Sequence, residues 1–224
     1  MREFLDKETG LRWVVPEITG IVSNNPEYIP EDEKSLDEFR KELNQYNSTS
    51  ISTYVTGGYC KLGDFMIWAN MGNSFPCYAF DDGKMVASAI IKPNNALGQM
   101  TALKDYIRFC EDNPVEFEDG IKGYISLKKA KKILLNSSKD TNADISYLVV
   151  IPPAQGRGVG TRAVKSISNN LDFFASGKTC DTICTEIHKK NTPSQKVFKR
   201  NGFEEYSLAR ELAYDPFGEY IKTI

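Results

Sequence analysis

Three glycines at alternate positions mark the segment of this sequence that is best suited to bind a phosphate group. Residues 152–161 read PPAQGRGVGT, between an apolar run ending at Ile151 and a helical pattern that starts near Gly158. Glycine allows close backbone approach, and the first N–H groups of a helix lack internal partners at the positive end of the helix dipole. We therefore expect a phosphate or diphosphate at this turn, with Arg157 and the Gln155 amide as further donors.

The glycine segment does not by itself require a ligand, and two nucleotide-binding folds do not fit the sequence around it. Three spaced glycines also occur in a flexible turn that merely enters a helix. Residues 158–163 satisfy the dinucleotide pattern G-x-G-x-x-A, but too little chain follows for the further βα units of that fold. The Gly-Lys-Ser/Thr of a nucleoside-triphosphate loop is absent from the segment.

The wider pattern resembles the GNAT superfamily of acyl-CoA N-acyltransferases, whose signature is Q/R-x-x-G-x-G/A after an apolar strand ending in V-x-P. Residues 150–160, VIPPAQGRGVG, match every signature position. A second block agrees with the family's N-x-x-S/A-x-x-x-Y-x-x-x-G-F, through Asn191, Ser194, Phe198 and the pair Gly202-Phe203. The resemblance is clear over about Asp144 to Tyr206.

The resemblance implies acetyl-CoA as acyl donor and a cofactor-binding set in two strands and two helix starts. In this family one strand splays from its neighbour and pantetheine lies in the gap. The strand residues implied for pantetheine and the acyl carbonyl are Leu148, Val149 and Val150. The diphosphate set is Gln155, Gly156, Arg157, Gly158, Val159, Gly160 and Thr161, and the second block adds Asn191, Ser194 and Phe198.

The resemblance further implies transfer of an acetyl group to a primary amine of a small molecule or a protein. An attacking amine must be neutral, so a base has to take its proton, and an acid assists the departing thiolate. The candidates are Asp144, Glu186 and Tyr147. Phe198 stands where many family members have a tyrosine that can protonate the departing sulfur, and phenylalanine cannot do so. A non-catalytic acyl-CoA-binding sensor is therefore the alternative function.

Alternating strand and helix patterns position these residues in the last third of the chain. β-formers run from Ile145 to Ile151, and apolar residues then recur at helical spacing until Gly177 supplies a stop. The pattern predicts a strand at Thr182–His188, a helix at Thr192–Arg200 and a strand at Phe203–Ala213.

The first part of the chain contains a predicted hairpin and several predicted helices. Strands at Cys77–Phe80 and Lys84–Ile91 flank the turn-forming pair Asp82-Gly83. Helical patterns cover Leu103–Cys110 and Leu127–Leu135, and an amphipathic helix is expected near residues 31–46.

The implied fold is α+β, an α/β three-layer arrangement with a mixed, mostly antiparallel central sheet, helices on both faces and one splayed strand pair. We expect a single domain of 224 residues. It would comprise an N-terminal elaboration (1–75), a hairpin with inserted helices (76–143) and an acyl-CoA-binding half (144–224).

Composition narrows the partners and the location. The net charge of −2 offers no broad positive field for nucleic acid, and no apolar run approaches the ~20 residues of a membrane span. A single histidine and five cysteines in scattered positions favour buried thiols and no metal. We expect a cytoplasmic protein with no membrane partner, and a homodimer is compatible with the sequence.

Overall fold

The computed structural model describes residues 2–15, 75–93, 96–113, 124–136, 142–175, 180–206 and 217–224. The helix predicted near residues 31–46 lies outside these residues, and so do Gly177 and Cys60. The chain divides into two compact units. The first comprises residues 1–92 and 145–177, and the second comprises residues 93–144 and 178–224.

The first unit is built on antiparallel strands from two hairpins. Strand β1 (Arg2–Leu5) pairs with β2 (Arg12–Val15), β2 pairs with β3 (Phe75–Asp81), and β3 pairs with β4 (Lys84–Pro93). The predicted hairpin is confirmed, and its tight turn has Asp82 at φ 49° and Gly83 at φ 74°. Positive φ at both central residues is what Asp-Gly pairs supply in two-residue hairpin turns.

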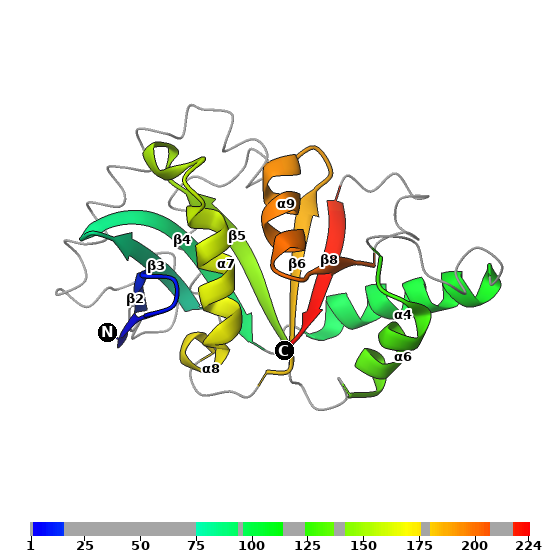
Figure 1. The fold of residues 1–224 in the computed structure, drawn as a ribbon. Coiled ribbons are helices and arrows are strands. Elements are labelled where there is room, and N and C mark those ends of the chain that lie inside the picture. Colours follow the sequence, from blue (N-terminus) through cyan, green and yellow to red (C-terminus); the bar gives the residue numbers. More distant parts are fainter. Residues whose placement is uncertain are drawn as a thin grey trace, which may run out of the picture. The chain divides into compact units, whose positions relative to one another are not determined.

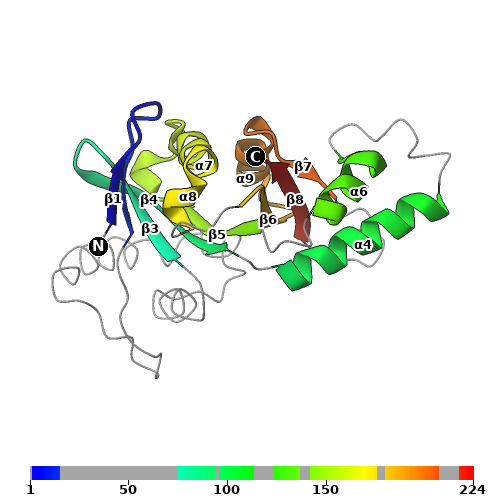
Figure 2. The same ribbon diagram turned by 90° about the horizontal axis from the view of Figure 1, so that it is seen from below.

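Strand β5 (Asn142–Val150) leads through a short 3₁₀ turn, η2 (Pro152–Ala154), into helix α7 (Val159–Asn169). The buried face of α7 carries Val159, Ala163, Val164 and Ile167, at the helical spacing that the sequence predicted. Trp13 and Phe174 are also fully buried, and their rings meet edge to face at 5.0 Å. Figures 1 and 2 show the strands of this unit together with helices α7 and α8.

The sequence pattern predicted one helix as far as Phe174, and the structure has two. Asn170 leaves the helical region, at φ −129° and ψ 37°, and separates α7 from the short α8 (Leu171–Phe174). The Asn170 side-chain amide donates to the Ser166 carbonyl, so the residue closes α7 by bonding to the helix backbone. The apolar spacing continues through this break, which is why periodicity alone missed it.

The second unit combines helices α4 (Ala96–Asp112), α6 (Leu127–Asn136) and α9 (Thr192–Arg200) with four strands. The start of β5 pairs in parallel with β6 (Thr182–His188), and β6 pairs antiparallel with β8 (Phe217–Thr223). The short β7 (Glu204–Glu205) lies on the other side of β8. The predicted strand Phe203–Ala213 is thus described only at Glu204–Glu205, and the segment from residue 207 lies outside the described residues.

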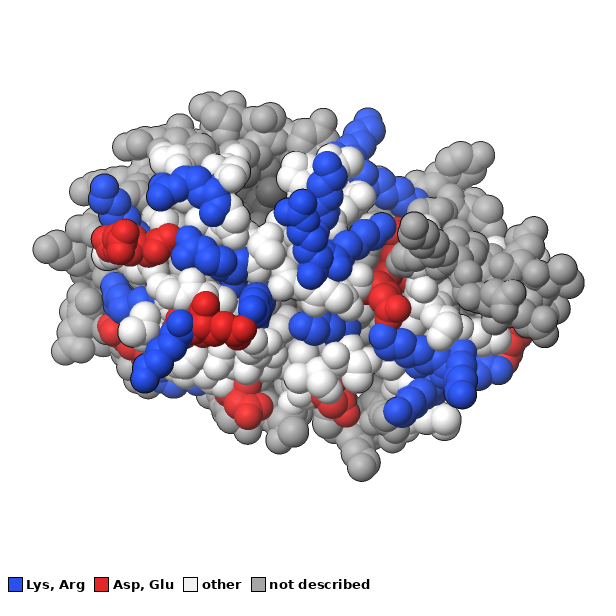
Figure 3. Space-filling view, viewed as in Figure 1, with Lys and Arg blue, Asp and Glu red and all other residues white. Residues whose placement is uncertain are grey.

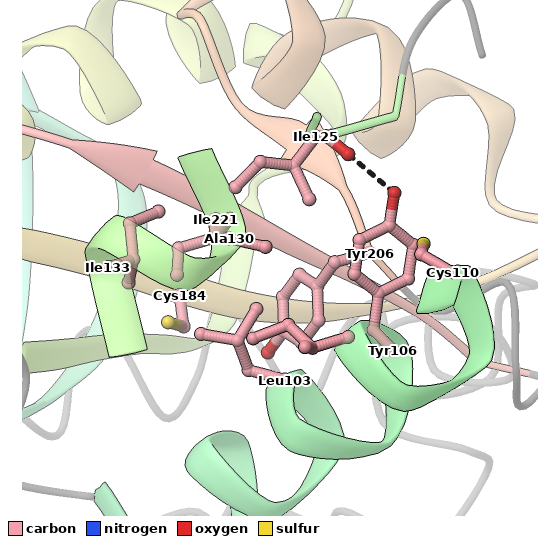
Figure 4. Close-up of a cluster of buried hydrophobic side chains, with 10 residues drawn as sticks. Leu103, Tyr106, Cys110, Ile125, Ala130, Ile133, Cys184, Tyr206 and Ile221 are labelled. Carbon is pink, nitrogen blue, oxygen red and sulfur yellow. Dashed lines mark hydrogen bonds between the residues drawn. The ribbon is translucent and has the colours of Figure 1, made fainter. Parts of the chain in front are cut away.

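Both faces of the sheet in the second unit carry helices. On one face, Cys184 and Ile221 pack under α4 and α6, as Figure 4 shows. This core contains Leu103, Tyr106, Ile107, Cys110, Ile125, Ala130, Ile133, Cys184, Tyr206 and Ile221. On the other face, Lys199 of α9 lies against Glu205 and the ring of Tyr220.

The hydrogen-bonded strand order is β1-β2-β3-β4-β5-β6-β8-β7, and β5 begins in the second unit and ends in the first. The sheet is mixed, with β5–β6 parallel and the hairpin and β6–β8 pairs antiparallel. The predicted α+β class is therefore confirmed. Strands β1, β2 and β8 were not predicted. Strands β1 and β2 have only four residues each, and β8 lacks a strict alternation of apolar and polar residues.

Candidate functional site

The turn before α7 has the backbone shape that the glycine pattern predicted. Gly156 and Gly158 have φ of 72° and 77°, in the left-handed region that favours glycine. Among the described residues, only chain neighbours approach within 4 Å of the point where a Cβ would stand at either glycine. Residues 155–158 are all exposed, so the turn is open to a ligand.

The N-terminus of α7 has no side-chain cap. Gly158 is its N-cap residue, and the first intrahelical bond joins the Arg162 N–H to the Gly158 carbonyl at 3.0 Å. In contrast, α9 is capped by Asn191, whose side-chain oxygen accepts from the Ser194 N–H at 3.2 Å. An uncapped start with left-handed glycines is a site for an anion, because the helix dipole and the first N–H groups point outward.

The strand before the turn is anchored by backbone and side-chain bonds. The Ile151 N–H donates to the Val86 carbonyl on β4 at 3.0 Å. The Gln155 amide, which the sequence suggested as an anion donor, donates instead to the Val150 carbonyl at 2.9 Å. Arg157 is exposed and retains its place as a candidate anion donor.

The other residues of the predicted cofactor set are distributed over β5, α7 and α9. Leu148, Val149 and Val150 are half-buried on β5, and Gly160 and Thr161 are half-buried in the first turn of α7. Val159 is buried and packs the start of α7 into the first unit. Their roles toward a cofactor stay predictions.

The second predicted block forms α9 and its cap. Asn191 and Ser194 are half-buried and bonded to each other as cap and first turn. Phe198 is 2% exposed and packs edge to face on Phe203, with ring centroids 5.0 Å apart. A buried ring without a hydroxyl supplies packing and no proton at this position.

Two of the three catalytic candidates share one face of the sheet in the second unit. Asp144 is the register partner of Cys184, and Glu186 lies two residues further along the same strand. Side chains two residues apart on a strand, and side chains directly opposite each other, point to the same face. Asp144 is 7% exposed, whereas Glu186 is exposed. Tyr147 lies on β5, and its side chain lies outside the described part of the structure.

Tyr206, which directly follows the short strand β7, is deeply buried. It is 2% exposed and within hydrogen-bond reach of the Cys184 thiol. Burial, followed by the nearby Cys184 and Glu219 groups, raises the pKa of Tyr206 well above its usual range. A phenol in this environment gives up its proton less readily than one in water.

The described cysteines are buried structural thiols, as the sequence predicted. Cys77, Cys110, Cys180 and Cys184 are all free and buried. Burial raises the pKa of the Cys184 thiol, so that it remains protonated and a poor nucleophile. No group of three or more metal-ligating side chains occurs among the described residues, and none of the described helices is long and apolar enough to span a membrane.

Residues 2–15 form contacts with α7 that the sequence did not predict. Arg162 Nη1 donates to the Thr9 carbonyl at 3.0 Å, and Trp13 Nε1 donates to Ser166 Oγ at 2.9 Å. No local pattern in the sequence predicts these two contacts, because more than 150 residues separate the two partners of each. The Asp6 to Gly10 turn was the one available signal, since acid and glycine flank a tight connection.

Charge is distributed differently over α7 and α9. On the face in Figure 3, positive and negative side chains alternate around α7, where Arg162 pairs with Asp81 and Lys165 pairs with Glu8. Over α9 the side chains are positive, and this helix contains Lys196, Lys199 and Arg200 without an acidic residue. Either pattern is compatible with an anionic ligand, and neither identifies one.

The mixed sheet and the open glycine turn before α7 are the features that the GNAT resemblance implied. Residues 99–204 match the family model described as an acetyltransferase (GNAT) domain. Residues 99–204 thus match a GNAT acetyltransferase domain, and the resemblance seen in the sequence is confirmed over that range. No protein of curated function matches the sequence.

Solved structures of this fold resemble between 85% and 100% of this chain at low sequence identity. The GNAT domain of S. lividans PAT has a TM-score of 0.56 and 13% identity, covering 100% of this chain and 96% of that one. An aminoglycoside acetyltransferase in complex with coenzyme A has a TM-score of 0.50 and 14% identity. The match covers 85% of this chain and 90% of that one. The Salmonella typhimurium acetyl transferase that modifies the N-terminal serine of ribosomal protein L7/L12 has a TM-score of 0.51 and 10% identity. The match covers 96% of this chain and 95% of that one. At this identity the likeness supports the fold and leaves the acceptor open.

Proposed function

We propose that the protein transfers an acetyl group from acetyl-CoA to a primary amine. The observation that carries the proposal is the open turn at Gly156 and Gly158, which leads into an uncapped helix within a GNAT domain. The CoA diphosphate would accept hydrogen bonds from the first N–H groups of α7, with Arg157 adjacent. We propose that the pantetheine follows Leu148, Val149 and Val150, and that Asn191, Ser194 and Phe198 also belong to the cofactor-binding set.

The chemistry is a direct acyl transfer. The neutral amine nitrogen attacks the thioester carbonyl carbon, the C–N bond forms and the C–S bond breaks. The amine's proton passes to a base, and the CoA thiolate leaves and takes a proton from solvent or an acid. Much of the protein's contribution is positioning of the two reactants, which can lower the barrier by several kcal/mol, about 7–11 in the most favourable cases.

Asp144 and Glu186 are the proposed proton acceptors, and Tyr147 is the proposed acid. Asp144 and Glu186 occupy one face of the sheet, and we propose that the acceptor amine approaches at Glu186, the exposed one of the two. Related folds include enzymes whose names give quite different acceptors, such as the Vibrio cholerae spermidine N-acetyltransferase in complex with CoA and spermine. We therefore propose an amine of a small molecule or of a protein, within a single cytoplasmic domain that can form a homodimer.

A non-catalytic acyl-CoA sensor is the second candidate, because Phe198 is a buried ring where a hydroxyl would protonate the leaving thiolate. Such a sensor would bind acetyl-CoA and release no thiol. Coenzyme A thiolate is a good leaving group, so the missing hydroxyl alone does not exclude turnover.

Titration with acetyl-CoA, followed by a thiol-release assay over a panel of amines, separates these functions. The enzyme releases thiol with at least one amine class, the sensor binds acetyl-CoA and releases none, and a protein that ignores acetyl-CoA has neither function. Gly158→Trp should weaken binding at least tenfold by filling the turn. Gly202→Trp is the matched control, because Gly202 is also exposed, with φ of 83° and open space at its Cβ position. Equal affinity in the two variants would overturn the placement of the diphosphate.

A further inference from the structure

One side chain in the first turn of α7 is held by two separate segments of the chain. Arg162 Nη1 donates to the Thr9 carbonyl at 3.0 Å, and Arg162 Nη2 donates to the Asp81 carboxylate at 2.5 Å. Thr9 lies in the turn between β1 and β2, and Asp81 is the last residue of β3. Each terminal nitrogen of the guanidinium therefore donates one hydrogen bond to protein.

Arg162 also closes the first turn of the helix through its backbone. Its N–H donates to the carbonyl of Gly158, the N-cap residue of α7, at 3.0 Å. A displacement of Arg162 therefore moves Gly158 and the N–H groups between the two residues. Because hydrogen bonds to an anion weaken with sub-ångström misplacement, the direction of this turn matters for a diphosphate.

The carbonyl that receives Arg162 belongs to a turn held firmly in place. The Asp6 carboxylate accepts from the Thr9 hydroxyl at 2.7 Å and from the Glu8 N–H at 2.9 Å. The Gly10 N–H donates to the Asp6 carbonyl at 2.7 Å, and Gly10 has φ of 73°. Since glycine adopts that φ without strain, Gly10 lets the Thr9 carbonyl face α7.

We infer that Arg162 is a positioning residue that fixes the first turn of α7 for the CoA diphosphate, through Asp81 and the Thr9 carbonyl. The inference rests on the proposed function. One N–H of each terminal nitrogen is bonded to protein, which holds the guanidinium toward Thr9 and Asp81, so the role inferred is positioning. The planar fork of arginine holds two acceptors in fixed directions, which a lysine at the same position does not reproduce.

Comparing two acyl donors tests the inference. Acetyl-CoA carries the diphosphate, whereas S-acetylpantetheine lacks it. Arg162→Met should weaken acetyl-CoA binding about tenfold or more and leave S-acetylpantetheine affinity unchanged, whereas general loss of structure would weaken both. Asp81→Asn should reproduce the selective effect, and the double variant should be little worse than Arg162→Met, because the two residues act through one contact.

Lys165→Met is the matched control. Lys165 lies one turn further along α7 and forms an ion pair with Glu8 at 2.6 Å, so this variant also removes a cation that joins α7 to the N-terminal hairpin. It should bind acetyl-CoA normally. Equal losses in Lys165→Met and Arg162→Met, or equal losses for both donors, would overturn the positioning role.

If Arg162→Met does not fold, Arg162→Lys is the variant that tests the inference. A lysine keeps the charge beside Asp81 and offers one point of attachment, so selective weakening of acetyl-CoA binding is again expected, at a smaller size. Unchanged acetyl-CoA binding in Arg162→Lys would then overturn the inference. Normal acetyl-CoA binding by Gly158→Trp would overturn the proposed diphosphate site itself. If Gly158→Trp binds acetyl-CoA weakly and Arg162→Met binds it normally, only the role of Arg162 is overturned.

Discussion

The indole N–H of Trp13 donates to the hydroxyl of Ser166 at 2.9 Å, and both residues are fully buried. This bond joins strand β2 to the middle of helix α7, between residues 153 positions apart in the chain. Ser166 is also hydrogen-bonded to the Asp6 carboxylate. The N-terminal hairpin therefore contributes directly to the support of the helix that begins at the glycine turn.

Trp13→Phe should destabilise the protein, because it leaves the buried Ser166 hydroxyl with fewer partners. We expect a loss of about 1–3 kcal/mol in the free energy of unfolding, measured by denaturant titration. Ser166→Ala provides the second arm of a double-mutant cycle. A coupling energy of at least ~0.5 kcal/mol is expected, and strictly additive effects would show that the bond contributes nothing.

Asp6 should make stability fall in acid. Burial raises the pKa of this carboxyl, but hydrogen bonds from Ser166, Thr9 and the Glu8 N–H outweigh burial and lower it overall. A lowered pKa in the folded state contributes stability that is fully present above the unfolded value of ~3.9 and is lost as pH falls below it. Asp6→Asn should therefore flatten the pH dependence of unfolding in that range. Asp172→Asn, an exposed change in α8, is the control and should leave the slope unchanged.

Tyr206→Phe should leave turnover nearly unchanged. The hydroxyl is buried near the Cys184 thiol and its pKa is raised, so it is poorly suited to protonate a leaving thiolate. Stability should fall by about 1 kcal/mol, the ordinary net contribution of one hydrogen bond. A large drop in kcat, together with loss of the basic limb of the pH–rate profile, would assign the acid role to Tyr206.

Glu186→Gln should lower kcat/KM more than Asp144→Asn does. Glu186 is exposed and can reach an acceptor amine, whereas Asp144 is 7% exposed beside Cys184. Loss of a general base typically lowers the rate by about 10²- to 10⁴-fold, so the Glu186 variant should fall in that range at neutral pH with normal acetyl-CoA affinity. The reverse order would transfer the base role to Asp144, and full activity in both variants would remove both residues from it.

Local patterns in the sequence determined several elements and the shape of the candidate site. The Asp82-Gly83 hairpin, the strand Thr182–His188 and the helix Thr192–Arg200 all appear where they were predicted. The left-handed glycines before α7 follow from the glycine spacing, because only glycine adopts that backbone without strain. In each case the deciding interactions lie within a few residues of one another.

Tertiary structure alone decided which distant segments support that site. Arg162 is bonded to Thr9 and Asp81, and Trp13 to Ser166, across separations that no periodicity can reveal. The pairing of β5 with β6 also placed Asp144 and Glu186 on one face of the sheet. The sequence determined the backbone of the turn through local sterics, whereas only long-range packing and hydrogen bonding could determine what holds that turn in place.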